Sequence, residues 1–382
     1  MPETYDLGGY GVMVNDRVRM DAYAAALARA VRPGDVVLDV GAGAGIFSLL
    51  ACRAGARRVF AVEPADAIHT ARELARENGL GDRIDFIQDV STAIQLPERA
   101  DVVVSDLRGA LPLFQHHVRS IADVRSRLMA PGGILLPRAD TLRAAPVEAA
   151  EAYGRLVAPW EDGVRGLRMG AARRMAVNTW VKTSLPSSAL LADPGTWAVL
   201  DYRTITEPDA RGTLEWTVAR PGTTHGLAVW FDAEVADGIG YSTGPGAPET
   251  VYGTPFFPFP QAVSVSAGDR LVSDIQARLV GDDYVWVWDT RIERAGLDPL
   301  QFRQSTVRGQ PLSPGRLRKR AHGFRPRLGE EGRIDAMILA RMDGGTSLEE
   351  VAREVHAAFP ARFPRWEDAL THVGRLSEQY AD

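Results

Sequence analysis

Short apolar runs alternate with amphipathic stretches over the first third of the chain. The apolar runs, which we expect to be strands, are residues 36–42, 58–63, 83–88, 100–106 and 133–137. Residues 66–78 and 116–129, between them, have the spacing of amphipathic helices. Strands that alternate with helices in this way predict βαβ units and a parallel sheet covered on both faces.

The pattern becomes β-rich after about Thr141. Residues 225–235, 262–280 and 283–292 alternate apolar and polar positions, and Gly, Pro and Asp turns separate them. This alternation predicts an antiparallel barrel or sandwich.

The end of the chain has a third pattern. Residues 312–328 are polar and basic, as expected of a linker. Helical periodicity follows, and Ser347 and Glu350 have the spacing of a capping box. We therefore predict an α/β Rossmann-like domain with its N-terminal helix at 1–138, a β-rich barrel-like domain at 139–311, a basic linker at 312–328 and a small helical, winged-helix-like module at 329–382.

Composition narrows the class of protein. The chain has 382 residues, a formal net charge of −5 and a single cysteine, Cys52. This charge predicts no general attraction to nucleic acid or anionic membranes. One cysteine can form neither an intrachain disulfide nor a cysteine-based zinc site. The acidic start predicts that no signal peptide is present there, and no apolar run is long enough to span a bilayer. We expect a cytoplasmic protein without a metal and without a membrane or nucleic-acid partner.

A glycine-rich turn follows the first predicted strand. The strand ends at Asp39, Gly41, Gly43 and Gly45 follow, and a helix is expected near Ile46. Glycines are needed where the backbone turns tightly and approaches a ligand without an intervening Cβ. The third glycine comes one residue earlier than in a dinucleotide fingerprint, which favours a cofactor without a pyrophosphate.

Polar residues also follow the next two predicted strands. Glu63 ends the second strand, where its carboxylate could accept hydrogen bonds from both hydroxyls of a ribose. An exposed strand-end glutamate is the alternative. Asp89 and Val90 follow the third strand, beside the expected position of an adenine ring.

Four segments together resemble protein arginine methyltransferases. Residues 13–27, 38–63, 105–114 and 130–137 have the order and nearly the spacing of that family, and residues 238–252 resemble part of its barrel. The resemblance implies that S-adenosylmethionine is the cofactor, that Arg19 pairs with the cofactor carboxylate and that Met13 lines the site. A guanidinium fork matches a carboxylate, which makes this pairing physically reasonable.

The acceptor site departs from the family pattern. The family holds a guanidinium between two glutamates, whereas this chain has Asp106 at the first position and the neutral Gln115 at the second. A Thr-His-Trp element of the family reads Thr-Val-Tyr at residues 250–252, so its histidine is absent. A buried guanidinium needs compensating negative charge. These differences argue against ordinary protein-arginine methylation.

Asp106, Gln115 and His116 are the candidate catalytic residues. Asp106 could accept a hydrogen bond from an amine or hydroxyl and orient it for methyl transfer. His116 or its neighbour His117 could be a general base, because histidine titrates near neutral pH. A solvated or structural role is the alternative for both. Three aromatic residues line either the acceptor pocket or the core: Trp230, Tyr241 and Tyr252.

Three functions are compatible with these residues. We expect a methyltransferase that uses S-adenosylmethionine to methylate nitrogen or oxygen of a peptide or natural-product-like small molecule. The alternatives are a divergent methyltransferase for protein or free arginine, and a non-catalytic binding or regulatory protein. Residues 332–360 resemble the winged-helix half of PqqD-like domains, which bind leader peptides; a structural cap or a homodimer contact is the other interpretation.

Overall fold

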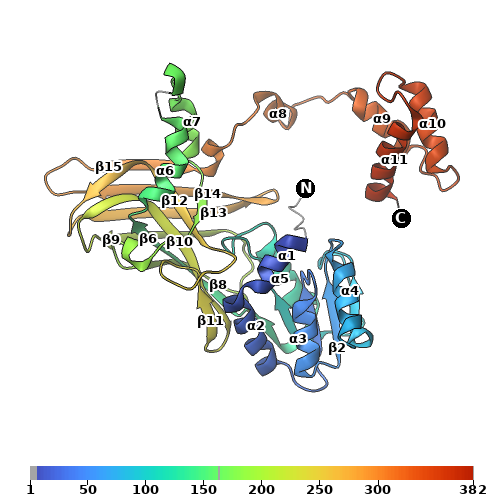
Figure 1. Ribbon diagram of the computed structural model, residues 1–382, viewed down its shortest axis with the longest axis horizontal. Helices are drawn as coiled ribbons and strands as arrows, with labels where there is room; N and C mark the ends of the chain where they lie inside the picture. Colours follow the sequence, from blue (N-terminus) through green and yellow to red (C-terminus); the bar gives the residue numbers. More distant parts are fainter. Residues whose placement is uncertain (1–6, 162–163, 382) are drawn as a thin grey trace. The chain divides into compact units, whose positions relative to one another are not determined.

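The computed structural model describes residues 7–161 and 164–381, and Figure 1 shows their helices and strands. The chain divides into two compact units, of which the first ends at Pro311 and the second begins at Leu312. The division falls at the start of the predicted basic linker.

The first part of the first unit contains a five-stranded parallel sheet with the strand order β3-β2-β1-β4-β5. Its strands are β1 (Val36–Val40), β2 (Arg58–Val62), β3 (Ile84–Ile87), β4 (Ala100–Ser105) and β5 (Met129–Leu136). The helices are α1 (Leu7–Asn15), α2 (Arg17–Ala30), α3 (Ile46–Ala54), α4 (Ala67–Glu77) and α5 (His117–Arg127). Every residue of β1 is buried, which confirms the prediction of a parallel sheet covered on both faces.

Two antiparallel sheets follow, as the alternating pattern predicted. The first has the order β7-β12-β10-β6-β8 with β11 paired to β10, and the second has the order β15-β14-β13-β9. Their strands are β6 (Ala139–Val147), β7 (Val181–Thr183), β8 (Gly195–Asp201), β9 (Ala210–Thr217), β10 (Gly222–Ala236), β11 (Ile239–Ser242), β12 (Thr254–Val265), β13 (Arg270–Val280), β14 (Asp283–Glu293) and β15 (Leu300–Ser305). A turn at Gly268, where φ is +92°, divides the alternating segment 262–280 between β12 and β13.

The described residues between β6 and β7 include the α-helices α6 (Ala150–Val157) and α7 (Gly170–Ala176). Figure 1 shows them (green) at the end of the antiparallel sheets remote from α2 and α3.

Aromatic side chains pack the two antiparallel sheets against each other. The fully buried Trp288 ring lies 5.2 Å from that of Phe257. Its Nε1 donates to the carbonyl oxygen of Pro258 at 3.2 Å. A single hydrophobic core continues from these sheets to the parallel sheet and includes Tyr23 of α2 and Phe231 of β10. The parallel sheet and the antiparallel sheets therefore share one core within the first unit.

The second unit is helical and has its own core. Its helices are α8 (Pro314–Lys319), α9 (Glu330–Leu339), α10 (Leu348–Ala358) and α11 (Trp366–Tyr380). Ser347 and Glu350 form the predicted capping box at the start of α10. No strand occurs within residues 312–381, so this unit has helices but no β wing there. The short helix α8 lies within the segment predicted as a linker. The likeness to PqqD-like domains remains a prediction.

In the part of the chain that the structure describes, no helix has both the length and the apolar character that a bilayer span requires.

The capping box predicts the local stability of α10. We expect Ser347→Ala to cost about 1 kcal/mol, because the amide of Glu350 loses its acceptor. Hydrogen exchange of the α10 amides in the full chain would measure the loss. Ser313 caps the exposed helix α8, and Ser313→Ala is the matched control that should leave α10 unchanged. Equal protection of α10 in wild type and Ser347→Ala would contradict the assignment.

Candidate active site

The predicted glycine turn lies between β1 and α3. Gly41 and Gly43 have φ values of +75° and +52°, a region that side chains other than glycine disfavour. A Cβ on Gly43 would lie 2.6 Å from the ring of Tyr10, and one on Gly41 would collide with the side chain of Leu107. The turn therefore runs closely under α1 and the segment after β4, with no room for side chains of its own.

Glu63 supports this turn from the end of β2. Its Oε2 accepts from the backbone N–H of Gly43 and its Oε1 from that of Ala65, both at 2.9 Å. The residue is 8% exposed. Each carboxylate oxygen retains a second lone-pair direction, so this arrangement leaves acceptor capacity for hydroxyl groups. The ribose role of Glu63 stays a prediction.

Asp39, at the end of β1, is fully buried beside the turn. Its Oδ2 accepts from the hydroxyl of Ser48 at 2.7 Å, whereas its Oδ1 has no hydrogen-bond partner among the described residues. Burial raises the pKa of Asp39 to about 7, and the nearby charge of Glu63 adds to the increase. The carboxyl group is therefore close to half-protonated at neutral pH.

Asp89 and Val90 lie beyond the end of β3 at the surface, and Val90 is 48% exposed. The backbone N–H of Glu63 donates to the carbonyl oxygen of Ile87 at 3.1 Å, which brings the ends of β2 and β3 together. The adenine contact of Asp89 and Val90 stays a prediction.

Arg19 of α2 is buried and connects three parts of the site. Its Nη1 donates to Oδ2 of Asp106 at 2.6 Å, and its Nη2 donates to the carbonyl oxygen of Met13 at 2.8 Å. Asp16 caps α2 by accepting from the Arg19 backbone N–H at 3.1 Å, which fixes the start of the helix. Nε of Arg19 is buried and has no acceptor among the described residues.

Asp106 follows β4 and has a side-chain exposure of 6%. The hydroxyl of Tyr252 lies 2.7 and 2.6 Å from its two carboxylate oxygens. Nη1 of Arg108 donates to its Oδ1 at 3.0 Å. Each of the two carboxylate oxygens of Asp106 therefore accepts from one arginine, and both lie within hydrogen-bond distance of the Tyr252 hydroxyl.

Arg108 is completely buried and connects Asp106 to the antiparallel sheets. Its Nε and Nη2 donate to the two carboxylate oxygens of Asp140 on β6, both at 2.8 Å. Its Nη1 also donates to the hydroxyl of Tyr23 at 2.6 Å. Asp140 in turn accepts from the hydroxyl of Tyr202 at 2.5 Å. We call Arg19, Asp106, Arg108 and Asp140 the buried charge cluster.

The protonation states of the buried charge cluster follow from its pairing. Burial alone would raise the pKa of Asp106, but the charges of Arg108 and Arg19 outweigh it and hold that pKa below its ordinary value. Burial alone would lower the pKa of Arg108, but Asp140 raises it well above the ordinary value. Asp106 is therefore a charged hydrogen-bond acceptor and a weak proton acceptor at neutral pH.

The other two candidate catalytic residues lie outside the buried charge cluster. Gln115 has a positive φ of 41° and makes no hydrogen bond with the cluster. His116 is exposed, and its Nε2 lies 3.1 Å from Oδ1 of the exposed Asp282. The structure thus does not bring His116 to Asp106, and its role as a general base stays a prediction.

His117 lies in the protein core, where a structural role is the alternative to a catalytic one. It is buried, and its Nε2 lies 3.0 Å from the hydroxyl of Tyr202. Burial, with the charge of Arg108, lowers the pKa of His117 to about 3, so the ring is neutral. Of the three aromatic candidates, Tyr252 contacts Asp106 and Tyr241 stacks on Tyr252, with ring centroids 6.1 Å apart. Trp230 belongs to a separate core group with Phe256.

Arg108 and Asp140 were not identified from the sequence. A signal for Asp140 was present, because it shares the inward-facing positions of β6 with Leu142 and Ala144. A carboxylate on an apolar strand face requires a cationic partner. The identity of that partner could not be derived, since Arg108 lies 32 positions away on another element.

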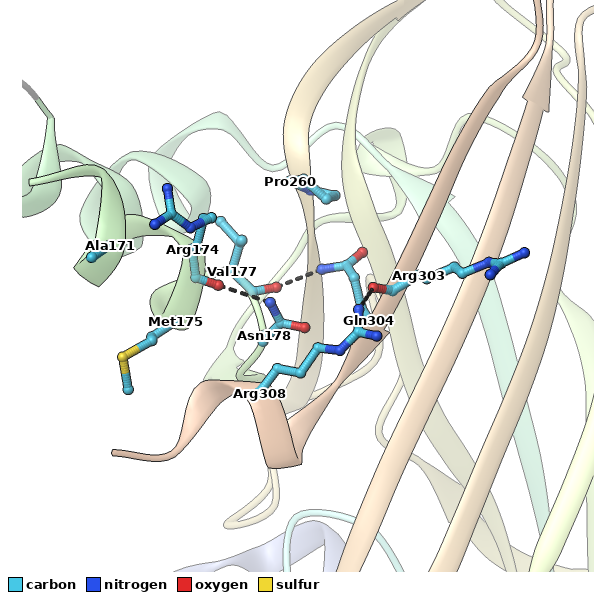
Figure 2. A pocket seen from close by; sticks show the side chains of 9 residues that line it. All are labelled: Ala171, Arg174, Met175, Val177, Asn178, Pro260, Arg303, Gln304 and Arg308. Atoms are coloured by element: carbon cyan, nitrogen blue, oxygen red, sulfur yellow. Dashed lines mark hydrogen bonds between the residues drawn. The ribbon is translucent and has the colours of Figure 1, made fainter. Parts of the chain in front are cut away.

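A separate hollow of about 520 Å³ lies between α7 and β15 (Figure 2). It is lined in part by Arg174, Arg303 and Arg308. Figure 2 shows that the side chain of Arg303 points away from that of Arg308, so these cations do not converge on one point. No group of His, Cys, Asp and Glu side chains suited to a metal ion occurs among the described residues.

Two protein-family models match the first unit of this chain, one over the parallel sheet and the other over much of the antiparallel sheets. A family model described as ribosomal protein L11 methyltransferase matches residues 23–150, and one described as the arginine methyltransferase oligomerization subdomain matches residues 138–288. Protein arginine N-methyltransferase 1 of Schizosaccharomyces pombe is 30% identical over 262 residues, with coverage of 64% of this chain and 73% of that protein. The chain belongs to the protein arginine methyltransferase family.

A further relative and two solved structures are also similar to this chain. A probable protein arginine N-methyltransferase 6.2 of Oryza sativa subsp. indica is 31% identical, and the chain spans 60% of its length. Among solved structures, the Trypanosoma brucei PRMT1 enzyme-prozyme complex with AdoHcy has a TM-score of 0.71 at 22% identity, with coverage of 78% of this chain and 98% of that one. Protein arginine methyltransferase 10 of Arabidopsis thaliana has a TM-score of 0.69 at 24% identity, with coverage of 79% and 98%. These structures confirm the predicted fold.

The raised pKa of Asp39 predicts a pH-dependent stability. Between about pH 4 and pH 7 the folded chain retains a proton on Asp39 that the unfolded chain has lost, so stability falls as the pH rises through this range. From pH 5 to pH 8 the loss due to this residue should be about 2–3 kcal/mol.

Asp39→Asn removes this titration, and urea unfolding at pH 5 and pH 8 measures the effect. The difference between the two pH values should shrink in the variant. Asp82→Asn, at an exposed aspartate, should retain the wild-type difference. An unchanged pH dependence in Asp39→Asn would contradict the assignment.

Proposed function

We propose that this family member is a methyltransferase that uses S-adenosylmethionine. The observation that carries the proposal is the buried Arg19 guanidinium, whose Nε has no acceptor among the described residues. A carboxylate is the group that best satisfies such a donor. The glycine turn and Glu63 lie at the ends of β1 and β2, where ligands bind in open α/β sheets. These residues fit a cofactor with an amino-acid tail and a ribose.

The chemistry requires an oriented acceptor more than a strong base. S-adenosylmethionine supplies a methyl group on a positively charged sulfur. An acceptor lone pair would displace the sulfur as an uncharged thioether, and the proton released by the acceptor would pass to solvent. Asp106 and Tyr252 would orient the acceptor by hydrogen bonds. The lowered pKa of Asp106 supports orientation rather than proton removal as its role.

Family membership favours an arginine side chain of a protein as the acceptor, ahead of the natural-product-like acceptor expected from the sequence. The matching relatives are named protein arginine N-methyltransferases. Asp106 stands at one of the two positions where the family has an acceptor-binding glutamate. Protein arginine methylation is therefore the first candidate for the specific reaction.

One observation favours a second candidate, an acceptor without positive charge. Asp106 is the only carboxylate of the two-glutamate pattern, since the other position is Gln115. Its oxygens already accept from Arg19, Arg108 and Tyr252. A neutral amine, amide or hydroxyl needs no counter-charge, whereas an added guanidinium does.

Turnover distinguishes these candidates from a non-catalytic binding protein. The full chain would be incubated with methyl-labelled S-adenosylmethionine, an arginine-rich peptide and the same peptide with citrulline in place of arginine. Release of S-adenosylhomocysteine with label on a peptide supports a methyltransferase. Cofactor binding without transfer to any acceptor supports the binding protein, and no cofactor binding contradicts the proposal as a whole.

The role of Arg19 predicts a selective loss of affinity. Arg19→Met should weaken S-adenosylmethionine binding by about 10- to 100-fold, because a charge-assisted pair with the cofactor carboxylate is lost. Isothermal titration calorimetry measures the affinity. Arg17 lies on the same helix and is exposed, so Arg17→Met is the matched control and should bind normally. Equal affinities of the two variants would contradict the placement of the cofactor tail at Arg19.

We also propose that the chain forms a homodimer. The support is the match of residues 138–288 to an oligomerization subdomain. Sedimentation equilibrium of the full chain should give twice the monomer mass of 41.5 kDa. A monomer at micromolar concentration would contradict this proposal without affecting the proposed reaction.

A further inference from the structure

Arg108 places its guanidinium against Asp106, the carboxylate that is proposed to bind the methyl acceptor. Its side chain has no exposed surface. It donates to Asp106 through Nη1 and to Asp140 through Nε and Nη2. The group that an arginine acceptor would bring to Asp106 is therefore already bonded to that residue.

The four charges of the buried charge cluster are balanced without a ligand. Arg19 and Arg108 carry two positive charges, and Asp106 and Asp140 carry two negative charges. The side-chain exposures of the four residues are 8%, 0%, 6% and 0%, respectively. A third guanidinium entering beside Asp106 would leave one buried positive charge uncompensated, which costs several kcal/mol.

Movement of Arg108 away from Asp106 is also unfavourable. Two parallel bonds to Asp140 fix the plane of the Arg108 guanidinium, and the hydroxyl of Tyr23 accepts a further bond from Nη1. Such paired bonds between a guanidinium and a carboxylate are strong and directional. The Asp140 side chain is itself held by the hydroxyl of Tyr202.

We propose that Arg108, fixed by Asp140, is a specificity-determining residue that directs this chain toward acceptors without positive charge. The inference rests on the proposed methyltransferase function and decides between its two candidate acceptor classes. Arg108 excludes a guanidinium by occupying the acceptor carboxylate and by balancing its charge. A neutral acceptor at Asp106 and Tyr252 would add no charge to the buried charge cluster.

Removal of the Arg108–Asp140 pair tests the proposal. Arg108→Met with Asp140→Ala deletes one charge of each sign, so it frees the Asp106 oxygen that Arg108 occupies without changing the net charge. This double variant therefore tests the occupation of Asp106, and Gln115→Glu added to it tests the effect of a further negative charge. Tyr202 keeps His117 as a partner in this variant. The probes are a Gly-Arg-Gly peptide and a Gly-citrulline-Gly peptide, which differ in charge but hardly in shape. Calorimetry with saturating S-adenosylhomocysteine gives the affinity for each peptide.

We expect wild type to bind the arginine peptide no more tightly than the citrulline peptide. The double variant should shift this preference toward arginine by about tenfold or more, which corresponds to about 1.4 kcal/mol. Gln115→Glu added to the double variant restores the second carboxylate and should increase the shift. An unchanged preference, or no binding of the arginine peptide by the double variant, overturns the proposal.

Two controls make the result specific. Arg143 and Asp232 form a partly exposed ion pair between β6 and β10, and Arg143→Met with Asp232→Ala should leave the peptide preference at the wild-type value. If Arg108→Met with Asp140→Ala fails to fold, Arg108→Gln with Asp140→Asn retains polar partners and removes both charges. Titration of the wild-type chain with S-adenosylhomocysteine alone separates the two failures. No binding of S-adenosylhomocysteine contradicts the methyltransferase, whereas normal binding with an unchanged peptide preference contradicts only the role of Arg108.

Discussion

The site depends on one constraint: charges buried away from water must be neutralised where they lie. Asp106 follows β4 of the parallel sheet and Asp140 lies on β6. Both side chains are buried, and each is paired with a guanidinium. Removing one partner from such a set is far more costly than removing a balanced pair, because the remaining charge is left without compensation. The positions of α2, the segment after β4 and the start of β6 are therefore coupled to one another.

This coupling explains how distant parts of the sequence form one site. Arg19 and Asp106 are 87 positions apart, and Tyr252 is 146 positions from Asp106. Asp16 adds a second connection, since its Oδ1 caps α2 and its Oδ2 accepts from the backbone N–H of Val251 at 2.7 Å. Because α2 contributes to both connections, a displacement of this helix would disturb the cofactor side and the acceptor side together.

The sequence predicted the local elements well and the charge pairing poorly. Local pattern was sufficient for the strands of the parallel sheet, the glycine turn at Gly41 and Gly43, and the capping box at Ser347, because each depends on neighbouring residues. The burial of Arg19 was predictable only through the resemblance to a family. The pair of Arg108 and Asp140 joins two elements whose separation depends on how the antiparallel sheets dock, and no local pattern contains that information. His116 and His117 show the same limit, since adjacent positions at the start of α5 place one ring in solvent and the other in the core.

The arrangement also bears on how far family membership determines the acceptor. A site that binds a cationic acceptor must supply negative charge in excess of its own cations, whereas the buried charge cluster supplies none. Arg19 is shared between Asp106 and the proposed cofactor carboxylate, so binding of that carboxylate would add one negative charge to the region. The ammonium group of the same cofactor tail and its methyl-bearing sulfur each carry a positive charge. Binding of the whole cofactor would therefore add one net positive charge, and the acceptor, whatever its identity, enters a region in which Arg108 has already compensated the available carboxylates.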